Sequence, residues 1–481
     1  MRRTLQFLSA LSRIAQARLH DKYTWQDQIA EQCERLGGVY IKFIQMLASH
    51  ETTKHWVSGI STDMAYEQVP YEPIDIAKEL GDKMHNFAEI EDVPFAAGSY
   101  GQVYHAKLLT GEDVIVKILR PSVRKTLRQD LRIINRITRV MSWMTKGMVF
   151  DVHDMTDEFS RTTIAETDYK REAESGEWLR SYFDQRGTLV IPRSYKELGS
   201  RYVLVQDYVP GISLASAMSQ QRQGKPIDQV VYEATGSNVW EQLTTLGKEA
   251  LNAVLYADFQ MVDPHPGNIR LLANNKVAMI DFGMMGKAPR NRSAFMNMVG
   301  EFIKIYEDRF EPGSFAASML AFYDMELHDA LQVIARQSSG DYVQSLETFV
   351  RQFVQSQAGD GLTQHYILDR QMARMFNEVI NNGNKLGICV SKENVMLVRS
   401  MNMFLSTMRM IGEAHGERVH FTLLHNMMVE AYQEALEKGF EQRPVPAMSD
   451  ERAYEVTANW LTVIAEKDRE LYGYIMRRRL A

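Results

Sequence analysis

Cysteine is scarce in this chain, because Cys33 and Cys389 are the only two among 481 residues. Neither lies near another cysteine or a suitable histidine in the sequence, so the pattern supports neither a disulfide scaffold nor a zinc knuckle. Such sparing use of cysteine is typical of proteins in a reducing compartment. We therefore expect a cytoplasmic location.

Long apolar runs are lacking too. The longest uncharged apolar stretch, near residues 315–323, is about half of the roughly 18 residues that suggest a membrane span, so no transmembrane segment is predicted. The first 20 residues contain four arginines and no acid, with leucines at helical spacing. This pattern favours a packed amphipathic helix over a transit peptide or a membrane-surface helix. Contact of the basic chain ends with an anionic membrane surface is kept as an alternative, which would make the protein peripheral to a membrane.

An excess of charge of one sign is also absent. The chain has 55 Lys and Arg against 61 Asp and Glu, a formal charge of −6, which argues against a dedicated nucleic-acid binder. Hydrophobic residues make up 45% and charged residues 24%, as in a globular protein with a sizeable core. At about 150 residues per domain, this length allows two to four domains.

Changes in hydrophobic periodicity and in turn residues divide the chain into four predicted regions. Residues 1–90 have a helical period, with breaks at glycine and proline pairs, and form an N-terminal helical extension. Residues 91–206 begin with alternating, β-branched strands around a Thr-Gly turn and continue with a helical insert. Residues 207–310 hold a long helix, predicted over 229–259, and a loop-strand-turn-strand-loop segment whose turn is expected at Asn274 and Asn275. Residues 311–481 form a C-terminal helical region.

Residues 96–103 have the spacing of a phosphate-binding loop. They read AAGSYGQV and match the kinase pattern G-x-G-x-x-G-x-V at every defined position except the first. Glycine lets the backbone come close to phosphate oxygens because it has no Cβ. Alone, the match is weak, and an ordinary hairpin turn with two glycines is the favoured interpretation. The candidate nucleotide contacts here are Ala96, Ala97, Gly98, Ser99, Gly101 and Val103.

Three further motifs follow in the order found in kinases. VIVK puts Lys117 on the next predicted strand, where such a lysine contacts the α and β phosphates. DPHPGN places Asp263 and Asn268 as in a catalytic loop, whose aspartate orients or deprotonates the acceptor and whose asparagine holds a metal ion. DFG then supplies Asp281 as a magnesium ligand. Because four motifs in the required order rarely coincide by chance, we predict a site for ATP and Mg²⁺.

A helix glutamate should complete the surroundings of the strand lysine. The candidates are Glu166, Asp168 and Glu172. Asp168 and Glu172 are four residues apart and share a helix face, whereas Glu166 and Asp168 point to different sides. We predict that Glu172 pairs with Lys117; the alternative is a solvated acidic helix.

The strand predicted in RYVLVQDYVPG links the β-rich segment to the helical one. Clefts between two such lobes bind nucleotides. We therefore add Gln206 and Tyr208 of this linker to the candidate nucleotide contacts.

Together these motifs resemble those of the UbiB/AarF family, also called ADCK, of atypical kinase-like proteins. The resemblance covers roughly residues 30–290 and, more loosely, the chain to about 415. The family has K-x-G-Q in an N-terminal extension and E-x-D before the helix glutamate, which here look like KFIQ and ETD. The resemblance implies that Lys42 and Gln45 fold over the active site and meet Glu166 and Asp168, in space that a peptide substrate would need. The lack of an A-P-E segment after DFG agrees with this.

Three positions depart from the family pattern. Ile44 stands where K-x-G-Q has glycine, which alters how closely that helix can pack. Gly98 stands where a third alanine is usual, which moves the loop toward that of an ordinary kinase. Met261, two residues before Asp263, stands where histidine is usual, and a thioether cannot make the hydrogen bonds of an imidazole.

The fold class predicted is α+β: a two-lobed protein-kinase-like fold with an N-terminal helical extension and a C-terminal helical region. The predicted function is that of a Mg²⁺-ATP-dependent atypical kinase or ATPase. The resemblance implies a role in isoprenoid-quinone or membrane-lipid metabolism, with an isoprenoid lipid as a partner. The alternatives are a small-molecule phosphotransferase and a catalytically weak, nucleotide-gated protein whose C-terminal helices hold a lipid or a partner protein.

Seven methionines lie between residues 395 and 428. Their number allows a pliable groove for a lipid or a partner helix, but filling of gaps in the core is the favoured interpretation.

Overall fold

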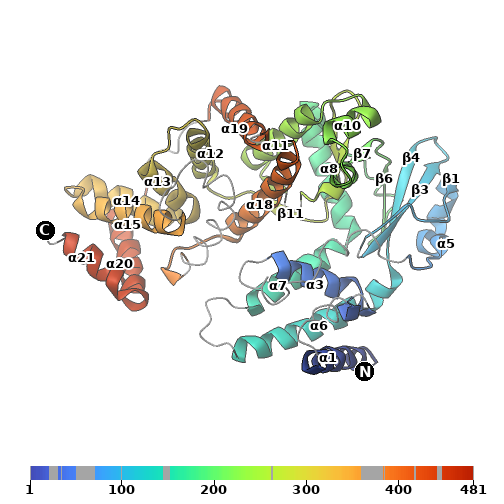
Figure 1. The fold of residues 1–481 in the computed structure, drawn as a ribbon, viewed down its shortest axis with the longest axis horizontal. Coiled ribbons are helices and arrows are strands. Elements are labelled where there is room, and N and C mark those ends of the chain that lie inside the picture. The colour runs from blue at the N-terminus through green and yellow to red at the C-terminus, as the bar shows by residue number, and fades with distance from the viewer. Residues whose placement is uncertain are drawn as a thin grey trace. The chain divides into compact units, whose positions relative to one another are not determined.

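The computed structural model describes residues 2–20, 31–33, 35–49, 71–98, 100–144, 152–261, 264–358, 383, 385–415, 419–440 and 447–479. These residues form two compact units (Figure 1). The first contains Met1–Ser181, Ile191–Val209 and Ile280–Met284. The second contains Tyr182–Val190, Pro210–Met279 and Met285–Ala481. The short segment that includes DFG therefore belongs to the first unit, although the strands on both sides of it belong to the second.

An antiparallel sheet organises the first unit. Its strand order is β1-β3-β4-β6, with β2 paired to the free part of β3. β3 and β4 form the predicted hairpin, and Gly111 in its turn has φ +104°, which favours glycine. The β-branched residues of β4 are buried on both faces, as expected for a central strand. The strands are β1 (Phe87–Ile90), β2 (Ala96–Ala97), β3 (Gly101–Leu108), β4 (Asp113–Leu119) and β6 (Val203–Asp207).

Helices pack beside this sheet and form a second core of the first unit. Buried side chains from α1, α3, α6 and α7 meet in it, among them Val39, Leu127 and Phe159. Arg3 of α1 donates to the buried Asp130 of α6 at 2.7 Å, so the predicted N-terminal amphipathic helix is present and is tied to the unit. The helices are α1 (Arg2–His20), α3 (Gly38–Ser49), α5 (Ile76–Leu80), the 3₁₀ helix η2 (Gly81–Asn86), α6 (Pro121–Met144), α7 (Val152–Glu166) and α8 (Tyr169–Arg186), which continues into the second unit.

The second unit is mostly helical. A large core formed by its helices includes the buried rings of Phe295, Phe315 and Phe322. Its helices are α9 (Leu214–Arg222), α10 (Ile227–Thr235), α11 (Val239–Tyr256), η3 (Pro266–Asn268), α12 (Arg292–Tyr306), α13 (Pro312–Tyr323), α14 (Met325–Gln337), α15 (Asp341–Ala358), α18 (Lys392–Glu413), α19 (Val419–Glu437), α20 (Asp450–Lys467) and α21 (Arg469–Arg479). No helix in the described ranges is long and apolar enough to cross a membrane.

The prediction of one long helix over 229–259 was wrong, because two helices occupy this stretch. Gly236 has a left-handed φ of +69° and ends α10, and its N–H donates to the carbonyl of Tyr232. Asn238 then caps α11 by accepting a hydrogen bond from the N–H of Trp240. The chain thus turns within three residues.

Short strands complete the second unit. The four-stranded sheet has the order β5-β10-β9-β7, and β8 pairs with β11. The predicted turn at Asn274 and Asn275 is confirmed, with φ of 59° and 54°, values that asparagine tolerates better than most residues. This turn joins β9 to β10 and so leads the chain from η3 toward DFG. The strands are β5 (Leu189–Val190), β7 (Ile212–Ser213), β8 (Phe259–Met261), β9 (Ile269–Leu271), β10 (Val277–Met279) and β11 (Met285–Lys287).

Candidate functional site

Lys117 is the centre of an ion cluster in the first unit. It lies on β4, opposite Val103 of β3 and Leu204 of β6. Its Nζ is 2.7 Å from Oε1 of Glu172 and 3.0 Å from Oδ2 of Asp281. The structure thus brings together three residues from three separate sequence motifs.

Two elements present the carboxylates of this cluster. Glu172 lies in the first turn of α8, and α8 begins at Tyr169 immediately after Asp168, whose carbonyl accepts from the N–H of Glu172. Asp281 belongs to the five-residue segment 280–284, and the N–H of Gly283 donates to its Oδ1 at 3.0 Å. The turn of the backbone therefore holds the Asp281 carboxylate in place.

The charged groups of this cluster shift one another's pKa values. Burial, reinforced by the Asp281 carboxylate, raises the pKa of Glu172 to about 7. Burial opposes ionisation of Asp281, yet the Lys117 ammonium and the Gly283 N–H hold the pKa of Asp281 below its usual range. Burial also opposes the charged form of Lys117, but the two carboxylates hold the pKa of Lys117 well above its usual value. At neutral pH, Lys117 is charged and Asp281 is ionised.

Burial differs between the two carboxylates. Glu172 is 2% exposed, whereas the side chain of Asp281 keeps 34% of its accessible surface. Glu172 therefore suits the orientation of Lys117. Asp281 can both contact Lys117 and reach a group that arrives from solvent.

The ring of Tyr169 packs against the Lys117 ammonium, a contact that no sequence motif indicated. The Lys117 ammonium is 5.1 Å from the centroid of the buried Tyr169 ring. A Cβ at Gly101 would collide with the Tyr169 hydroxyl. The glycine at 101 is thus required by packing against a tyrosine as well as suited to a phosphate loop.

The rest of the predicted phosphate loop is less crowded. Ala96 and Ala97 form β2, and the N–H of Gly98 donates to the carbonyl of Gly101 at 2.9 Å. A Cβ at Gly98 would meet no atom nearer than 4.0 Å. Ser99 lies outside the described residues.

The linker strand β6 contacts the DFG segment. Gln206, predicted as a nucleotide contact, is buried, and its Nε2 donates to the carbonyl of Ile280 at 3.0 Å. Tyr208 follows β6 and is exposed; its ring lies 4.9 Å from that of His105. Only Tyr208 of this pair presents its side chain to solvent.

Phe282 of DFG anchors its segment against α8. Its ring is buried, and a Cβ at Gly176 would lie 2.9 Å from it. Gly176 thus makes room for the aromatic ring on the helix that also carries Glu172. No sequence motif marked this glycine.

Lys42 lies close to the cluster. Its ammonium forms an ion pair with Glu166 at the end of α7 and lies 5.2 Å from the centroid of the Tyr100 ring. Asp168 forms its ion pair with Arg201, at 3.3 Å. Gln45 lies in α3, but its side chain is outside the described atoms. Of the contacts that the resemblance implied, the structure contains the pair of Lys42 with Glu166.

The predicted catalytic loop lies in the second unit. Asn268 ends η3, and His265 begins it by accepting the Gly267 N–H at 3.0 Å. Met261 is buried in β8, opposite Met285 of β11. Asp263 lies outside the described residues. Among the described residues, no group of three His, Cys, Asp or Glu side chains is arranged to hold a metal ion.

Comparison with known proteins covers the region that carries these motifs. Residues 64–310 match the sequence profile of the ABC1 atypical kinase-like domain. An uncharacterised protein of Synechocystis is 32% identical over 278 residues, 55% of this chain and 66% of that protein. A protein of Marinobacter nauticus named probable protein kinase UbiB is 29% identical over 56% of this chain and 49% of its own length.

Two further matches are a chloroplast protein and a solved structure. The chloroplast protein ACTIVITY OF BC1 COMPLEX KINASE 3 of Arabidopsis thaliana is 27% identical over 47% of this chain and 30% of its own length. A Mycobacterium tuberculosis protein solved with erythromycin aligns with 78% of this chain and 85% of that structure, with a TM-score of 0.49 and 19% identity. The sequence matches thus span between 30% and 66% of the relatives' own lengths. The matched profile agrees with the predicted kinase-like α+β fold.

Proposed function

Since the chain belongs to the ABC1 atypical kinase-like family, to which proteins named UbiB and AarF also belong, we propose that it is a Mg²⁺-ATP-dependent phosphotransferase or ATPase. The observation that carries this proposal is the ion cluster of Lys117, Glu172 and Asp281. In kinases, a strand lysine held by a helix glutamate contacts the phosphates, and the DFG aspartate holds magnesium. The same three residue types meet here within 3.0 Å of one ammonium.

The charge of the cluster fits a nucleotide that arrives with a divalent cation. Glu166, Glu172 and Asp281 supply three carboxylates, against the two ammonium groups of Lys42 and Lys117. A bare triphosphate would meet a site whose acids outnumber its bases, so a metal complex is favoured. Bound Mg²⁺ would neutralise charge on the phosphates.

Each remaining motif has a part in this proposal. Asp281 and Asn268 would hold the metal ion, Asp263 would orient the acceptor or water, and the backbone at Gly98 and Gly101 would cover the phosphates. Transfer of the terminal phosphoryl group breaks its bond to the bridging oxygen and forms one to the acceptor oxygen, whose proton passes to a base. In hydrolysis the acceptor is water.

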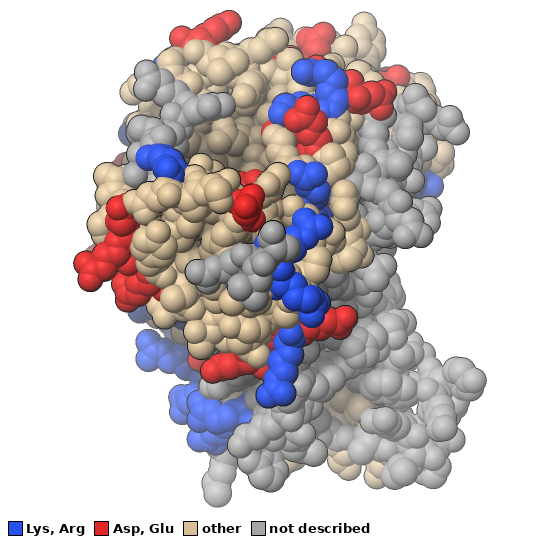
Figure 2. Space-filling model, turned by 90° about the vertical axis from the view of Figure 1, so that its left-hand side faces the viewer, with Lys and Arg blue, Asp and Glu red and all other residues tan. Residues whose placement is uncertain are grey.

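We extend the proposal to an acceptor in isoprenoid-quinone or membrane-lipid metabolism, reached at a membrane surface. Leu5 and Leu8 are exposed on α1, a helix with no acid in its first turn. On the face of the second unit that carries α14, α20 and α21, lysine and arginine side chains gather in a band (Figure 2). Basic side chains of this kind attract anionic lipid.

The test is ATP hydrolysis by the purified chain with Mg²⁺, with and without anionic vesicles. We expect Asp281→Asn to reduce turnover at least about 100-fold, because the metal loses a charged ligand. The matched control is Asp82→Asn, which removes an exposed carboxylate from the same unit. Equal turnover in wild type and Asp281→Asn, or none in either, would refute the proposal.

A further inference from the structure

An ion network holds the carboxyl end of α8 in the second unit. Arg186 is the last residue of α8, and its guanidinium donates to both carboxylate oxygens of Glu249, at 2.7 and 2.8 Å. The same guanidinium donates to Oε1 of Glu434 at 2.8 Å. Glu249 belongs to α11 and Glu434 to α19, so three helices meet at one cation.

The Glu434 carboxylate accepts hydrogen bonds from three side chains. Its Oε2 accepts from the Asn252 amide at 2.9 Å, and its Oε1 accepts from the Lys438 ammonium at 2.6 Å as well as from Arg186. Burial opposes ionisation of Glu434, yet the donors Lys438 and Arg186 lower its pKa to about 2. Glu434 is therefore ionised at neutral pH, and its hydrogen bond with Arg186 is charge-assisted.

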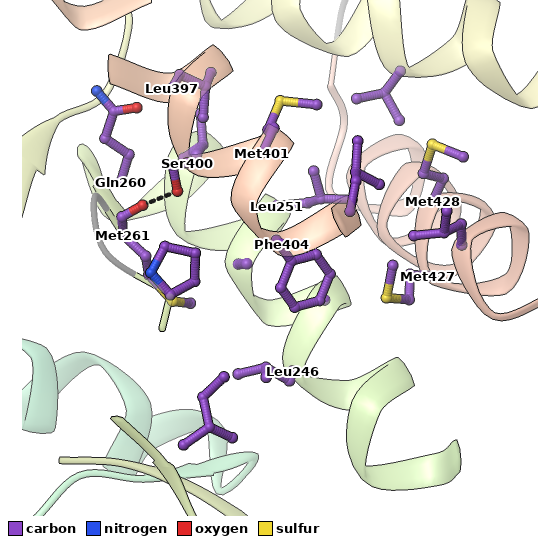
Figure 3. Close-up of a pocket in the computed structure, with 18 of the residues that line it drawn as sticks. Leu246, Leu251, Gln260, Met261, Leu397, Ser400, Met401, Phe404, Met427 and Met428 are labelled. Atoms are coloured by element: carbon purple, nitrogen blue, oxygen red, sulfur yellow. Dashed lines mark hydrogen bonds between the residues drawn. The ribbon is translucent and has the colours of Figure 1, made fainter. Parts of the chain in front are cut away.

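Close packing of α19 on α11 places Glu434 in this network. A Cβ at Gly247 of α11 would collide with the side chain of Met427 of α19. Met427 is buried, as expected for a methionine that fills a gap in the core. Figure 3 shows Met427 of α19 and Leu246 and Leu251 of α11 on the wall of one cavity. The two helices are thus fitted to each other one turn and more before Glu434.

One face of α8 connects the ion network with the partner of Lys117. Five residues on this face follow one another at alternating spacings of four and three: Glu172, Gly176, Leu179, Phe183 and Arg186. Side chains at these spacings share one side of a helix. All five are buried except Arg186, whose side chain keeps 16% of its accessible surface. Glu172 and Arg186 are about 21 Å apart along the helix axis, at 1.5 Å per residue.

Glu434 comes from a part of the chain outside the matched kinase-like domain. The match with the ABC1 domain ends at residue 310, so it contains Arg186 and Glu249 but not Glu434. The C-terminal helical region thus supplies a carboxylate to the helix that carries Glu172.

We propose that Glu434 is a positioning residue for the Lys117 cluster: by holding Arg186 it fixes the orientation of α8 and so keeps Glu172 against Lys117. This role rests on the proposed ATP site and gives the C-terminal region a part in it. A packed helix is stiff, so freedom at its carboxyl end is transmitted to its amino end. Gly176 packs on Phe282 in the middle of α8, hence loss of Glu434 loosens the pair of Glu172 and Lys117 without abolishing it.

The variant that tests this role is Glu434→Ala, because it leaves the buried Glu249 paired with Arg186. Arg186→Ala would leave Glu249 buried without a counter-charge, which is strongly destabilising. The matched control is Glu430→Ala, one turn earlier on α19. Glu430 pairs with Lys248 of α11, at 3.4 Å, instead of with α8.

Hydrogen exchange of the full chain without nucleotide measures both ends of α8. In Glu434→Ala we expect roughly tenfold faster exchange in residues 182–186, as for the loss of one charge-assisted hydrogen bond, and a smaller increase in residues 169–174. Glu430→Ala should leave residues 169–174 at the wild-type rate. A network that only stabilises the second unit would change residues 182–186 alone, and that result would overturn the positioning role.

Mg²⁺-ATP hydrolysis is the second readout. We expect kcat/KM of Glu434→Ala to fall roughly tenfold, with both kcat and KM changed, as for a displaced catalytic group. Glu430→Ala should keep the wild-type values. Faster exchange in residues 169–174 with unchanged turnover would also overturn the positioning role. Absence of turnover in the wild type refutes the proposed function, whereas the exchange measurement still decides whether Glu434 acts on the end of α8 that carries Glu172.

Discussion

At the scale of single residues, one partly buried ammonium is shared by two carboxylates with different tasks. Lys117 contacts Glu172 and Asp281, but only Asp281 keeps substantial exposure. A buried cation needs a partner, and removal of one partner leaves an uncompensated charge. The arrangement therefore allows Asp281 to turn toward a metal ion while Glu172 still neutralises Lys117.

The raised pKa of Glu172 predicts a pH-dependent stability difference. Its pKa moves from 4.5 to about 7, so the folded state binds this proton more tightly than the unfolded chain does. The stabilisation from this group is complete below about pH 4.5 and is lost as the pH rises through 7. We therefore expect Glu172→Gln, which cannot titrate, to gain stability relative to wild type over this window, by at most about 1.4 kcal/mol per pH unit.

Urea unfolding at pH values from 4.5 to 7.5 measures this difference. The control is Glu174→Gln, two residues along α8 at an exposed position. Its stability should follow that of wild type at every pH. A Glu172→Gln curve parallel to that of wild type would contradict the raised pKa.

At the scale of elements, the two glycines of the loop between β2 and β3 have different surroundings. Gly101 begins β3 and packs directly on Tyr169 at the start of α8. Gly98 has open space where its Cβ would be. The loop is thus fixed at its second glycine and uncrowded at its first.

This difference predicts that the same substitution lowers the free energy of unfolding at one glycine and leaves it nearly unchanged at the other. We expect Gly101→Ala to destabilise the protein by about 1–3 kcal/mol, since the added methyl group displaces the Tyr169 hydroxyl. Gly98→Ala should change the stability by less than about 0.5 kcal/mol. Thermal unfolding of both variants is the measurement; equal losses would show that packing on Tyr169 does not set the requirement for glycine.

At the scale of the whole molecule, the chain crosses several times between two compact units. The segment 280–284 belongs to the first unit, although β10 before it and β11 after it belong to the second. Its contacts explain this assignment, because Ile280 bonds to Gln206, Asp281 to Lys117, and Phe282 packs on Gly176. The DFG segment therefore belongs with β4 and α8 of the first unit.

Hydrogen exchange should locate the bound nucleotide. We expect Mg²⁺-ATP to slow amide exchange most in residues 96–119 and 169–174 and at DFG. In Asp281→Asn this protection should disappear. The same protection in wild type and Asp281→Asn would contradict a role of this carboxylate in holding the metal ion.

Sequence alone was sufficient for the chemistry of the ion cluster. The spacing of motifs identified Lys117 and Asp281, and the helix glutamate that accompanies such a lysine in kinases was assigned to Glu172 among three acids, because these signals are local along the chain. The hairpin at Gly111 and the turn at Asn274 were predicted for the same reason. Between 229 and 259 the prediction overlooked local signals, because Gly236 and the capping Asn238 divide the expected helix.

Tertiary structure alone decided what surrounds those residues. The contacts of Gly101 with Tyr169, of Gly176 with Phe282 and of Asp168 with Arg201 join positions whose separations follow no sequence period. The sequence by itself determined the family and the ionic chemistry, since these depend on residue types at short spacings. Packing determined which glycines are essential and which side chains surround the ion cluster, since these depend on distances between segments far apart in the chain.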